Sequence, residues 1–366
     1  MNRIDSLDWQ RGLLAFSIML YHLAGWQLGA LDASTLLGRL GIYGVSMFFV
    51  LSGLSMALVY HSYIKDMGSS AKFFVRRIFR IWPLLWCAVA FASATAMMAH
   101  QTPSPTMIAL NLTTAFGFVA PSAYMNAGAW SIGNEMVYYA FTPLLIFAFN
   151  KRVLYGNLLT AAAVVVGIWF AGAALTSELS LASQWALYIN PFNNFFLYCA
   201  GVALYYNADR LTVGNTANVA CLLIGITVFL AYPVVGDQIH LVTGVARAVF
   251  SLASVLLVFA FYKNRVHIPT VLSAPLTQLG VVTYGVYLLH PIVYQCTLSL
   301  FKRLAIQVSP HMSIAIIVAL TIVLAMLAFK LLEEPMIRLG KKLTSTAVTS
   351  SPKVPTAATS HQAGRR

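Results

Sequence analysis

Charged side chains are scarce in this sequence. Only 9% of the 366 residues are Asp, Glu, Lys or Arg, whereas 59% are hydrophobic. An average soluble domain carries about 25% charged residues, so this composition excludes a water-soluble globule. Cysteine is scarce as well, and its spacing suits neither a disulfide framework nor a metal site. We assign to packing, and to no metal, the residues Cys87, Cys199, Cys221 and Cys296.

The sequence also lacks the pattern of a secretory signal peptide and a visible internal repeat. Asp5 and Asp8 interrupt the basic leader that a secretory signal peptide needs, and the apolar run that follows outlasts a normal signal core. We therefore expect this run to be retained as a helix. No internal repeat is visible, which disfavours a transporter because many transporter folds are built from repeated halves.

Long apolar runs recur along nearly the whole chain. A helix of about 20 apolar residues spans the hydrocarbon core of a bilayer. The sequence therefore predicts an all-α, polytopic membrane bundle of about ten spans, near residues 10–30, 40–61, 78–99, 132–150, 157–176, 192–207, 215–235, 243–262, 279–300 and 312–332. The shorter and more polar stretch 104–120 fits an interfacial or re-entrant piece, or an eleventh span.

Basic residues are distributed unevenly between the two sides of this predicted bundle. With the N-terminus inside, nearly all of the 23 Lys and Arg residues fall on the cytoplasmic side, and the exceptions are Arg39, Arg247, Lys302 and Arg303. Basic residues accumulate in cytoplasmic loops, so we expect both termini in the cytoplasm. The net charge of +13 is then explained by topology and anionic lipid, without nucleic acid.

The chain is expected to form one membrane domain, 1–343, followed by a tail. Residues 344–366 are rich in Thr, Ser, Pro and Ala and are expected to be disordered. The long segment from His100 to Ser131 carries no Lys, Arg, Asp or Glu and holds three prolines. That composition suits an outer lid or a surface facing an acceptor.

Ionisable residues inside apolar spans are costly and are candidates for function. The first span carries Arg11 and His22, eleven residues apart, which places both on one helical face about 16 Å apart along the axis. Arg11 would mark the cytosolic end of this face, and His22 would lie beyond the midplane. Topology alone also explains Arg11, and packing alone explains His22.

Glu135 is predicted just inside the outer end of the fourth span, at a depth similar to that of His22. A buried carboxylate needs a partner, and an imidazole that it orients would become a better base. If the two side chains meet, they form a base and its orienting group. A helix N-terminal carboxylate favoured by the helix dipole is the alternative.

Two other segments carry polar groups at the membrane. Arg77 and Arg80 share one helical face at the start of the third span, and paired guanidinium groups grip phosphate or pyrophosphate, although lipid anchoring explains them too. In the ninth span Tyr287 precedes His290 by one turn, and Pro291 follows directly. A substrate contact and a packing histidine at a proline kink fit His290 equally well.

These segments together resemble the acyltransferase family three membrane enzymes, which O-acetylate bacterial surface polysaccharides. The resemblance covers about Arg3 to Leu343. It rests on six strings in order: Leu7-Asp8 with Arg11-x10-His22, Gly44 to Gly53, Arg77-x-x-Arg80 before Pro83, Trp130-Ser131 leading to Glu135, Tyr284 to Pro291, and Glu334-Pro335. Ile132-Gly133-Asn134 departs from the usual Leu and small or Val residues, which affects packing more than chemistry.

The resemblance implies a stand-alone enzyme of the bacterial inner membrane with a cytosolic acyl-CoA donor, usually acetyl-CoA, and a carbohydrate hydroxyl as acceptor. It also implies that Arg11, Arg77, Arg80 and His22 matter to activity. We expect the arginines to bind the donor phosphates, and His22, supported by Glu135, to act as base or as transient acyl carrier. Candidates for substrate contacts or oxyanion donors are Trp130, Ser131, Tyr139, Tyr287 and His290.

The sequence also fits two other classes of protein, a transporter and a sensor or scaffold. In a transporter or lipid-linked-sugar flippase, the buried His, Glu and Arg would line a translocation path. A sensor or scaffold would need none of them. Exopolysaccharide, lipopolysaccharide O-unit, periplasmic glucan, peptidoglycan and small glycosides all fit as acceptors, and neither acyl length nor oligomeric state can be read from the sequence.

Overall fold

The computed structural model describes residues 4–263 and 269–345, and these residues form helices and loops without a strand. The helices, with two π-helical segments η1 and η2, are α1 (Asp5–Leu28), α2 (Leu36–Tyr60), α3 (Met67–Met98), α4 (Pro105–Leu112), α5 (Phe116–Val119), α6 (Ala129–Lys151), α7 (Val153–Trp169), η1 (Phe170–Ala174), α8 (Trp185–Tyr188), α9 (Pro191–Ala208), α10 (Asn215–Ala231), α11 (Ile239–Val242), α12 (Gly244–Tyr262), α13 (Thr270–Val281), α14 (Thr283–Arg303), α15 (Pro310–Ala328), η2 (Phe329–Glu333) and α16 (Glu334–Thr344). The predicted all-α fold is confirmed.

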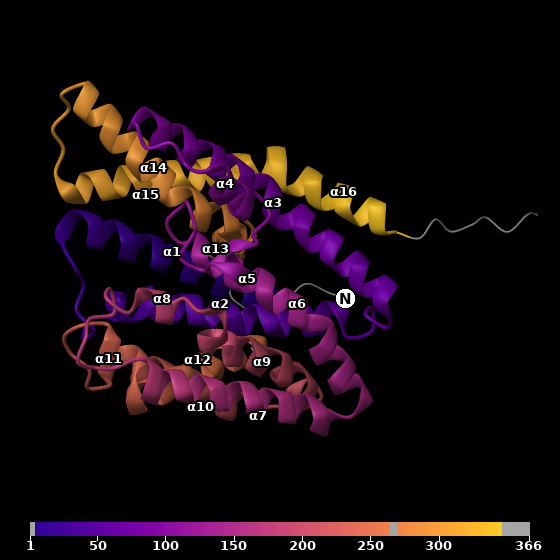
Figure 1. Ribbon diagram of the computed structural model, residues 1–366. Helices are drawn as coiled ribbons and strands as arrows, with labels where there is room; N and C mark the ends of the chain where they lie inside the picture. The colour runs from indigo at the N-terminus through magenta and orange to yellow at the C-terminus, as the bar shows by residue number, and fades with distance from the viewer. Residues whose placement is uncertain (1–3, 264–268, 346–366) are drawn as a thin grey trace, which may run out of the picture.

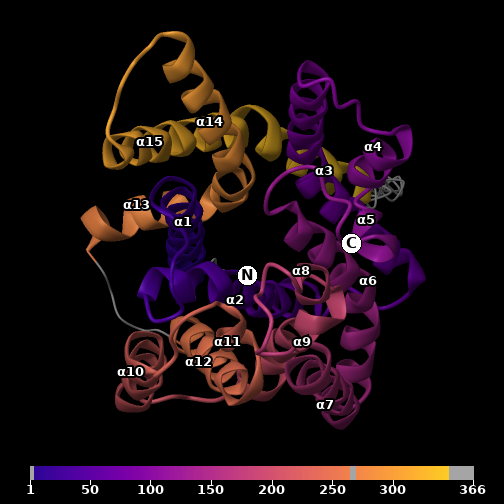
Figure 2. The same cartoon turned by 60° about the vertical axis from the view of Figure 1, so that its left-hand side comes forward.

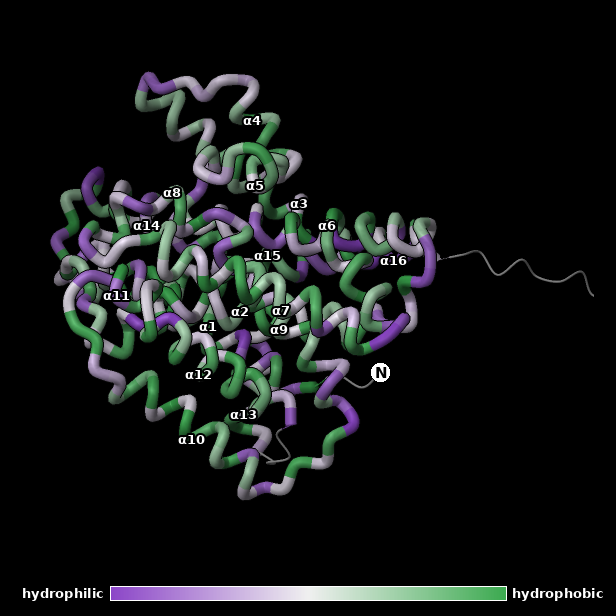
Figure 3. The backbone as a smooth tube through the Cα atoms, turned by 60° about the horizontal axis from the view of Figure 1, so that its bottom comes forward, coloured by the Kyte–Doolittle hydropathy of each residue, from purple (hydrophilic) through white to green (hydrophobic). Residues whose placement is uncertain are grey.

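Each predicted span contains a helix, yet fewer helices qualify as spans on their own. Within the described ranges, six are long and apolar enough to cross a membrane, or up to seven when the bent pair α13–α14 counts as one. The helices α1 and α9 are long enough but more polar, and α10 is short. Figure 3 shows α10 and α12 coloured mainly as hydrophobic, and many of their apolar side chains face outward, as in a multi-pass membrane protein.

The helices α1 and α2 lie at the centre of the bundle. Figures 1 and 2 show α13, α14 and α15 beside α1 on one side, and α7, α9, α10 and α12 beyond α2 on the other. The start of α1 and the end of α16 lie toward the same end of the molecule, since Ile4 and Lys341 line one cavity. Functional groups on α1 and α2 therefore have neighbours from both halves of the chain.

Glycines set the closest helix contacts around this centre. A Cβ atom on Gly53 of α2 would lie 2.0 Å from the carbonyl oxygen of Tyr198, and one on Gly201 of α9 would lie 2.0 Å from that of Val50. Only the missing side chains allow the two backbones to approach this closely. This contact fixes the rotation of α2, and with it the direction of the polar side chains that α2 carries into the site.

A second glycine contact joins α1 to α13. A Cβ atom on Gly280 would lie 2.1 Å from the carbonyl oxygen of Asp8, and one on Gly12 would lie 2.9 Å from the backbone nitrogen of Gly280. The chain then bends by 69° between α13 and α14. The break in this part of the chain falls at Val282, whereas α14 runs on through Pro291. The bend lays α14 against α1.

The stretch 104–120 forms the two short helices α4 and α5. With 8 and 4 residues, neither is long enough to span a bilayer, so an eleventh span is excluded there. Asn111 holds the segment together by donating to the carbonyls of Met107 and Ala123 and accepting from the amide of Met125. The segment packs on α6, where Gly117 faces Gly133.

The predicted domain boundary at residue 343 falls one residue before the end of α16. Thr344 is still helical and buried, and its hydroxyl accepts a hydrogen bond of 2.7 Å from Nε of Arg76. The rest of the expected tail, residues 346–366, lies outside the described residues.

Candidate active site

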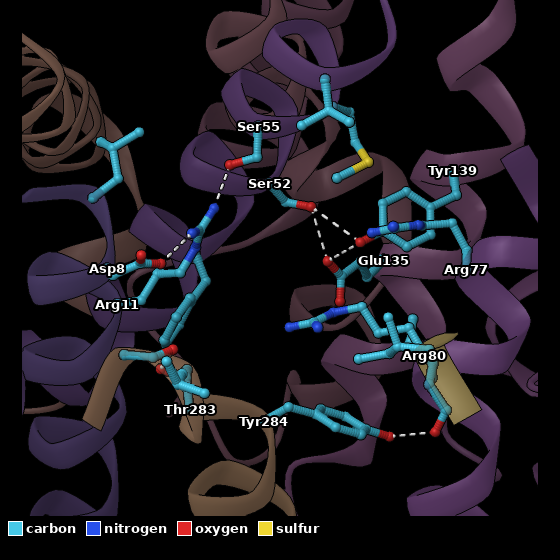
Figure 4. A pocket seen from close by; sticks show the side chains of 18 of the residues that line it. Asp8, Arg11, Ser52, Ser55, Arg77, Arg80, Glu135, Tyr139, Thr283 and Tyr284 are labelled. Atoms are coloured by element: carbon cyan, nitrogen blue, oxygen red, sulfur yellow. Dashed lines mark hydrogen bonds and ion pairs between the residues drawn. The ribbon is translucent and has the colours of Figure 1, made fainter. Parts of the chain in front are cut away.

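A cavity of about 800 Å³ opens between α1, α2, α3, α6, α14 and α16. Figure 4 shows its polar lining, with Arg11 on one side, Glu135 on the other, and Arg80 extending into the space beside Glu135. The lining includes Arg11, Arg76, Arg77, Arg80, Arg338, Lys341, Asp8, Glu135 and Glu334, a formal balance of +3. This volume suits a drug-sized or cofactor-sized ligand, and the charge suits an anion.

The two arginines that α3 places one turn apart in this lining, Arg77 and Arg80, are held differently. Arg77 donates to the hydroxyl of Tyr60 at 3.0 Å, and its guanidinium carbon lies 5.8 Å from the ring centre of Tyr139. Arg80 makes no hydrogen bond or ion pair to another described residue. Both arginines line the same cavity. Arg80 keeps its donors for a ligand.

Arg11 joins these arginines from α1. It forms an ion pair of 3.0 Å with Asp8 and a short hydrogen bond to the hydroxyl of Ser55. These two partners fix its guanidinium at the cavity wall, opposite α3 (Figure 4). Guanidinium groups from α1 and α3 therefore converge on one space, although the whole of α2 separates them along the chain.

Glu135 does not contact His22, which corrects the pairing expected from their similar depth. Its carboxylate accepts hydrogen bonds of 2.8 Å from Ser52 and 2.5 Å from Tyr139. The turn of α6 that carries Glu135 faces α2, whereas His22 faces α14. Glu135 thus belongs to the cavity wall beside Arg77 and Arg80 rather than to the histidine.

His22 instead pairs with His290. Nδ1 of His22 lies 2.9 Å from Nε2 of His290, and Nδ1 of His290 lies 3.1 Å from the carbonyl oxygen of Val286. The imidazole rings are within 13° of parallel with centres 5.1 Å apart, as expected for two coplanar rings joined edge to edge. His290 is fully buried and His22 is partly exposed.

Tyr287 connects this pair to the cavity. Its hydroxyl lies 2.8 Å from the hydroxyl of Ser131, and both residues line the cavity. Its ring centre is 6.2 Å from that of His290, one turn further along α14. The histidine pair therefore lies directly behind the inner wall of the cavity. Trp130 lines no part of that wall and packs between Phe49, Trp185 and Tyr188.

Several lining or neighbouring residues were not anticipated from the sequence. Ser52 and Ser55 stand three apart in the mainly apolar helix α2, and this spacing, which places both on one face, could have been read from the sequence. Trp26, one turn after His22, stacks on it with ring centres 5.3 Å apart and planes at 11°. Tyr60 gave no sequence signal beyond being aromatic, and Tyr284 was noted only as the start of a string that resembles the family.

The fold and the site together define a multi-pass helical membrane protein with a cationic internal cavity that ends beside a histidine pair. Residues 4–330 match the family described as an acyltransferase domain, and the chain belongs to this family. It is also 26% identical over 360 residues to the "putative membrane-bound transacylase BcsY" of Komagataeibacter xylinus, covering 91% of this chain and 83% of that protein. No solved structure matches.

Proposed function

We propose that this membrane acyltransferase moves an acyl group, usually acetyl, from cytosolic acyl-CoA to a hydroxyl of a cell-envelope carbohydrate in a bacterial inner membrane. One observation carries the proposal. A single cavity offers guanidinium groups of Arg11, Arg77 and Arg80 in its lining and has Tyr287, backed by His290 and His22, in its wall. Acyl-CoA matches this arrangement, because it is an elongated molecule with anionic phosphates at one end and a reactive thioester at the other.

The topology supports access from the cytosol. The cavity is lined by Ile4 at the start of α1 and by Arg338 and Lys341 of α16, at the end of the molecule that carries most basic residues. We place this end in the cytoplasm, with about ten spans and both termini inside. Helices that are too polar to cross a membrane on their own, such as α1, would then cross it surrounded by neighbouring helices.

The arginines would bind the phosphates of the donor. Guanidinium groups form paired, charge-assisted hydrogen bonds with phosphate oxygens, and Arg80 has its donors free of other described residues. Glu135, held by Ser52 and Tyr139, would limit the repulsion among the arginines while the site is empty. The pantetheine arm would then extend past Ser131 and Tyr287 toward the histidines.

His22 would carry the chemistry. As a general base, it takes the proton of the acceptor hydroxyl while the hydroxyl oxygen attacks the thioester carbonyl. The carbon–sulfur bond then breaks, and the CoA sulfur leaves with the proton that His22 returns. In the covalent route, Nε2 of His22 attacks the thioester carbon, the carbon–sulfur bond breaks and CoA thiolate leaves. The acceptor hydroxyl then attacks the acyl group, the bond to Nε2 breaks, and the proton of the hydroxyl passes through His22 to the thiolate. The hydroxyls of Tyr287 and Ser131, 2.8 Å apart in the cavity wall, are the candidate donors for an oxyanion.

The acceptor would approach beside Trp26. This side chain is 39% exposed, and its ring stacks on His22 and lies 4.8 Å, centre to centre, from that of Tyr294. The electron-rich faces of aromatic rings attract the polarised C–H groups of sugars. A sugar lying on Trp26 would hold its hydroxyl next to the imidazole that has to deprotonate it.

The test is release of free CoA from acetyl-CoA by purified protein in lipid vesicles containing cell-envelope glycans. We expect release by the wild type, loss in His22→Ala, and wild-type release in His311→Ala, which removes an exposed histidine of α15. Movement of glycan across the vesicle without CoA release would identify a transporter or flippase instead. Equal release by His22→Ala and wild type would keep the enzyme but remove His22 from its mechanism.

A further inference from the structure

We propose that His290 is a positioning residue that fixes the tautomer of His22, so that Nε2 of His22 is the atom without a proton. The inference rests on the proposed function for its catalytic meaning, but the tautomer itself follows from the hydrogen bonds of His290. A neutral histidine here takes the place that a carboxylate occupies in most base-and-orienter pairs.

The carbonyl oxygen of Val286 determines which nitrogen of His290 carries the proton. A carbonyl only accepts hydrogen bonds, so Nδ1 of His290, 3.1 Å away, must carry a proton and donate it. A neutral imidazole has one N–H, which leaves Nε2 of His290 as an acceptor. The only described polar group within hydrogen-bond distance of that atom is Nδ1 of His22, at 2.9 Å.

The proton of His22 is fixed in turn by His290. Because Nε2 of His290 accepts, Nδ1 of His22 must donate, and the proton of a neutral His22 is therefore on Nδ1. Its Nε2 keeps a lone pair on the opposite edge of the ring. The nearly coplanar rings satisfy this bond, because an N–H donor lies in the plane of its ring.

A doubly protonated His290 would reverse the assignment, and its surroundings disfavour it. His290 is fully buried, and its described contacts are His22, Tyr287, Trp26 and the Val286 carbonyl. None of these is a carboxylate, and a buried cation without a counter-charge is strongly disfavoured. The Glu135 carboxylate hydrogen-bonds to Ser52 and Tyr139 on α2 and α6 instead.

The position of this proton decides whether Nε2 of His22 can react. A histidine with its proton on Nε2 would present an N–H to the acceptor hydroxyl and could neither take its proton nor attack the thioester. Holding the proton on Nδ1 keeps the free edge of His22 ready for either route. Backbone geometry of α14 thereby acts on the reacting atom through two hydrogen bonds, from Val286 to His290 to His22.

The test compares His290→Gln with His290→Leu. A glutamine can place its side-chain oxygen near the former Nε2 and accept from His22, whereas leucine of similar size cannot. We expect His290→Leu to lower kcat by about 10² to 10⁴, the usual contribution of a general base, with the KM for acetyl-CoA unchanged. His290→Gln should recover most of that loss, and thermal unfolding should show both variants folded. Equal losses in both folded variants would overturn the proposal.

A second readout does not depend on activity. Solid-state NMR of ¹⁵N-histidine-labelled protein in bilayers, with signals assigned by comparison with His22→Ala and His290→Gln, reports which ring nitrogens carry protons. We expect His22 with a protonated Nδ1 and a bare Nε2. A protonated Nε2 in His22 would overturn the proposal. Absence of CoA release together with the expected tautomer would refute the proposed function alone.

Discussion

Arg80→Gln is the substitution that tests the donor site most cleanly. Arg80 lines the cavity without a hydrogen bond or ion pair to another described residue, so its replacement breaks no hydrogen bond and removes only the charge that interacts with the Glu333 carboxylate. Arg77→Gln, by contrast, would also remove the bond to Tyr60. Loss of Arg80 should therefore change stability little, by about 1 kcal/mol or less, as for charge interactions without a direct ion pair.

The effect on donor binding follows from the lost phosphate contact. A hydrogen bond to a charged group contributes about 1.5–3 kcal/mol, and 1.4 kcal/mol corresponds to a factor of ten. Arg80→Gln should weaken CoA binding by about tenfold to a hundredfold, measured by titration calorimetry on protein in nanodiscs. Arg152→Gln, which removes an exposed arginine that does not line the cavity, should bind CoA as the wild type does.

A truncated donor separates phosphate recognition from general disruption. Acetyl-pantetheine lacks the nucleotide phosphates, so its KM should be the same for wild type and Arg80→Gln. If Arg80→Gln weakens acetyl-pantetheine as much as acetyl-CoA, or weakens neither, the assignment of Arg80 to the phosphates is wrong.

Three further substitutions test other parts of the structure. Glu135→Gln removes the anion beside the arginines and should tighten CoA binding by about threefold to tenfold, since roughly 1 kcal/mol of repulsion is lost; weaker binding in calorimetry would contradict this. Trp26→Ala should raise the KM for the glycan acceptor and leave that for acetyl-CoA unchanged, and a rise in the donor KM would speak against an acceptor platform. Gly201→Ala places a Cβ atom 2.0 Å from a backbone carbonyl of α2 and should lower the free energy of unfolding by about 1–3 kcal/mol, measured as a lower unfolding midpoint. Gly172→Ala, with open space around its Cβ, should leave the midpoint unchanged.

Apolar periodicity was enough to predict where the helices lie. The expected spans 40–61 and 243–262 differ by only a few residues from α2 (Leu36–Tyr60) and α12 (Gly244–Tyr262), because an apolar run of membrane length has few alternatives to a helix. The bend at Val282 was missed. The sequence drew attention to Pro291, but α14 continues through that residue, and the 69° bend lies next to the segment where α13 packs on α1.

The site could be predicted as a set of residues but not as a set of contacts. Depth along a helix suggested that Glu135 and His22 meet, yet depth does not specify which neighbour a helix face touches. The partner of His22 is His290, 268 residues away, and the partner of Glu135 on α2 is Ser52, 83 residues away. Both pairs depend on how the helices are rotated against each other, and for α2 the close contact of Gly53 with α9 decides this rotation.

The central claim is that acyl-CoA occupies the arginine-lined cavity with its thioester end toward the histidine pair. The most direct measurement is a cryo-EM structure of the protein in nanodiscs with a thioether analogue of acetyl-CoA, which cannot transfer its acyl group. The account predicts phosphate density at Arg77 and Arg80 and the sulfur next to Tyr287, on the side of His22. Analogue density outside this cavity, or in it with the phosphates at the histidine end, would contradict the account.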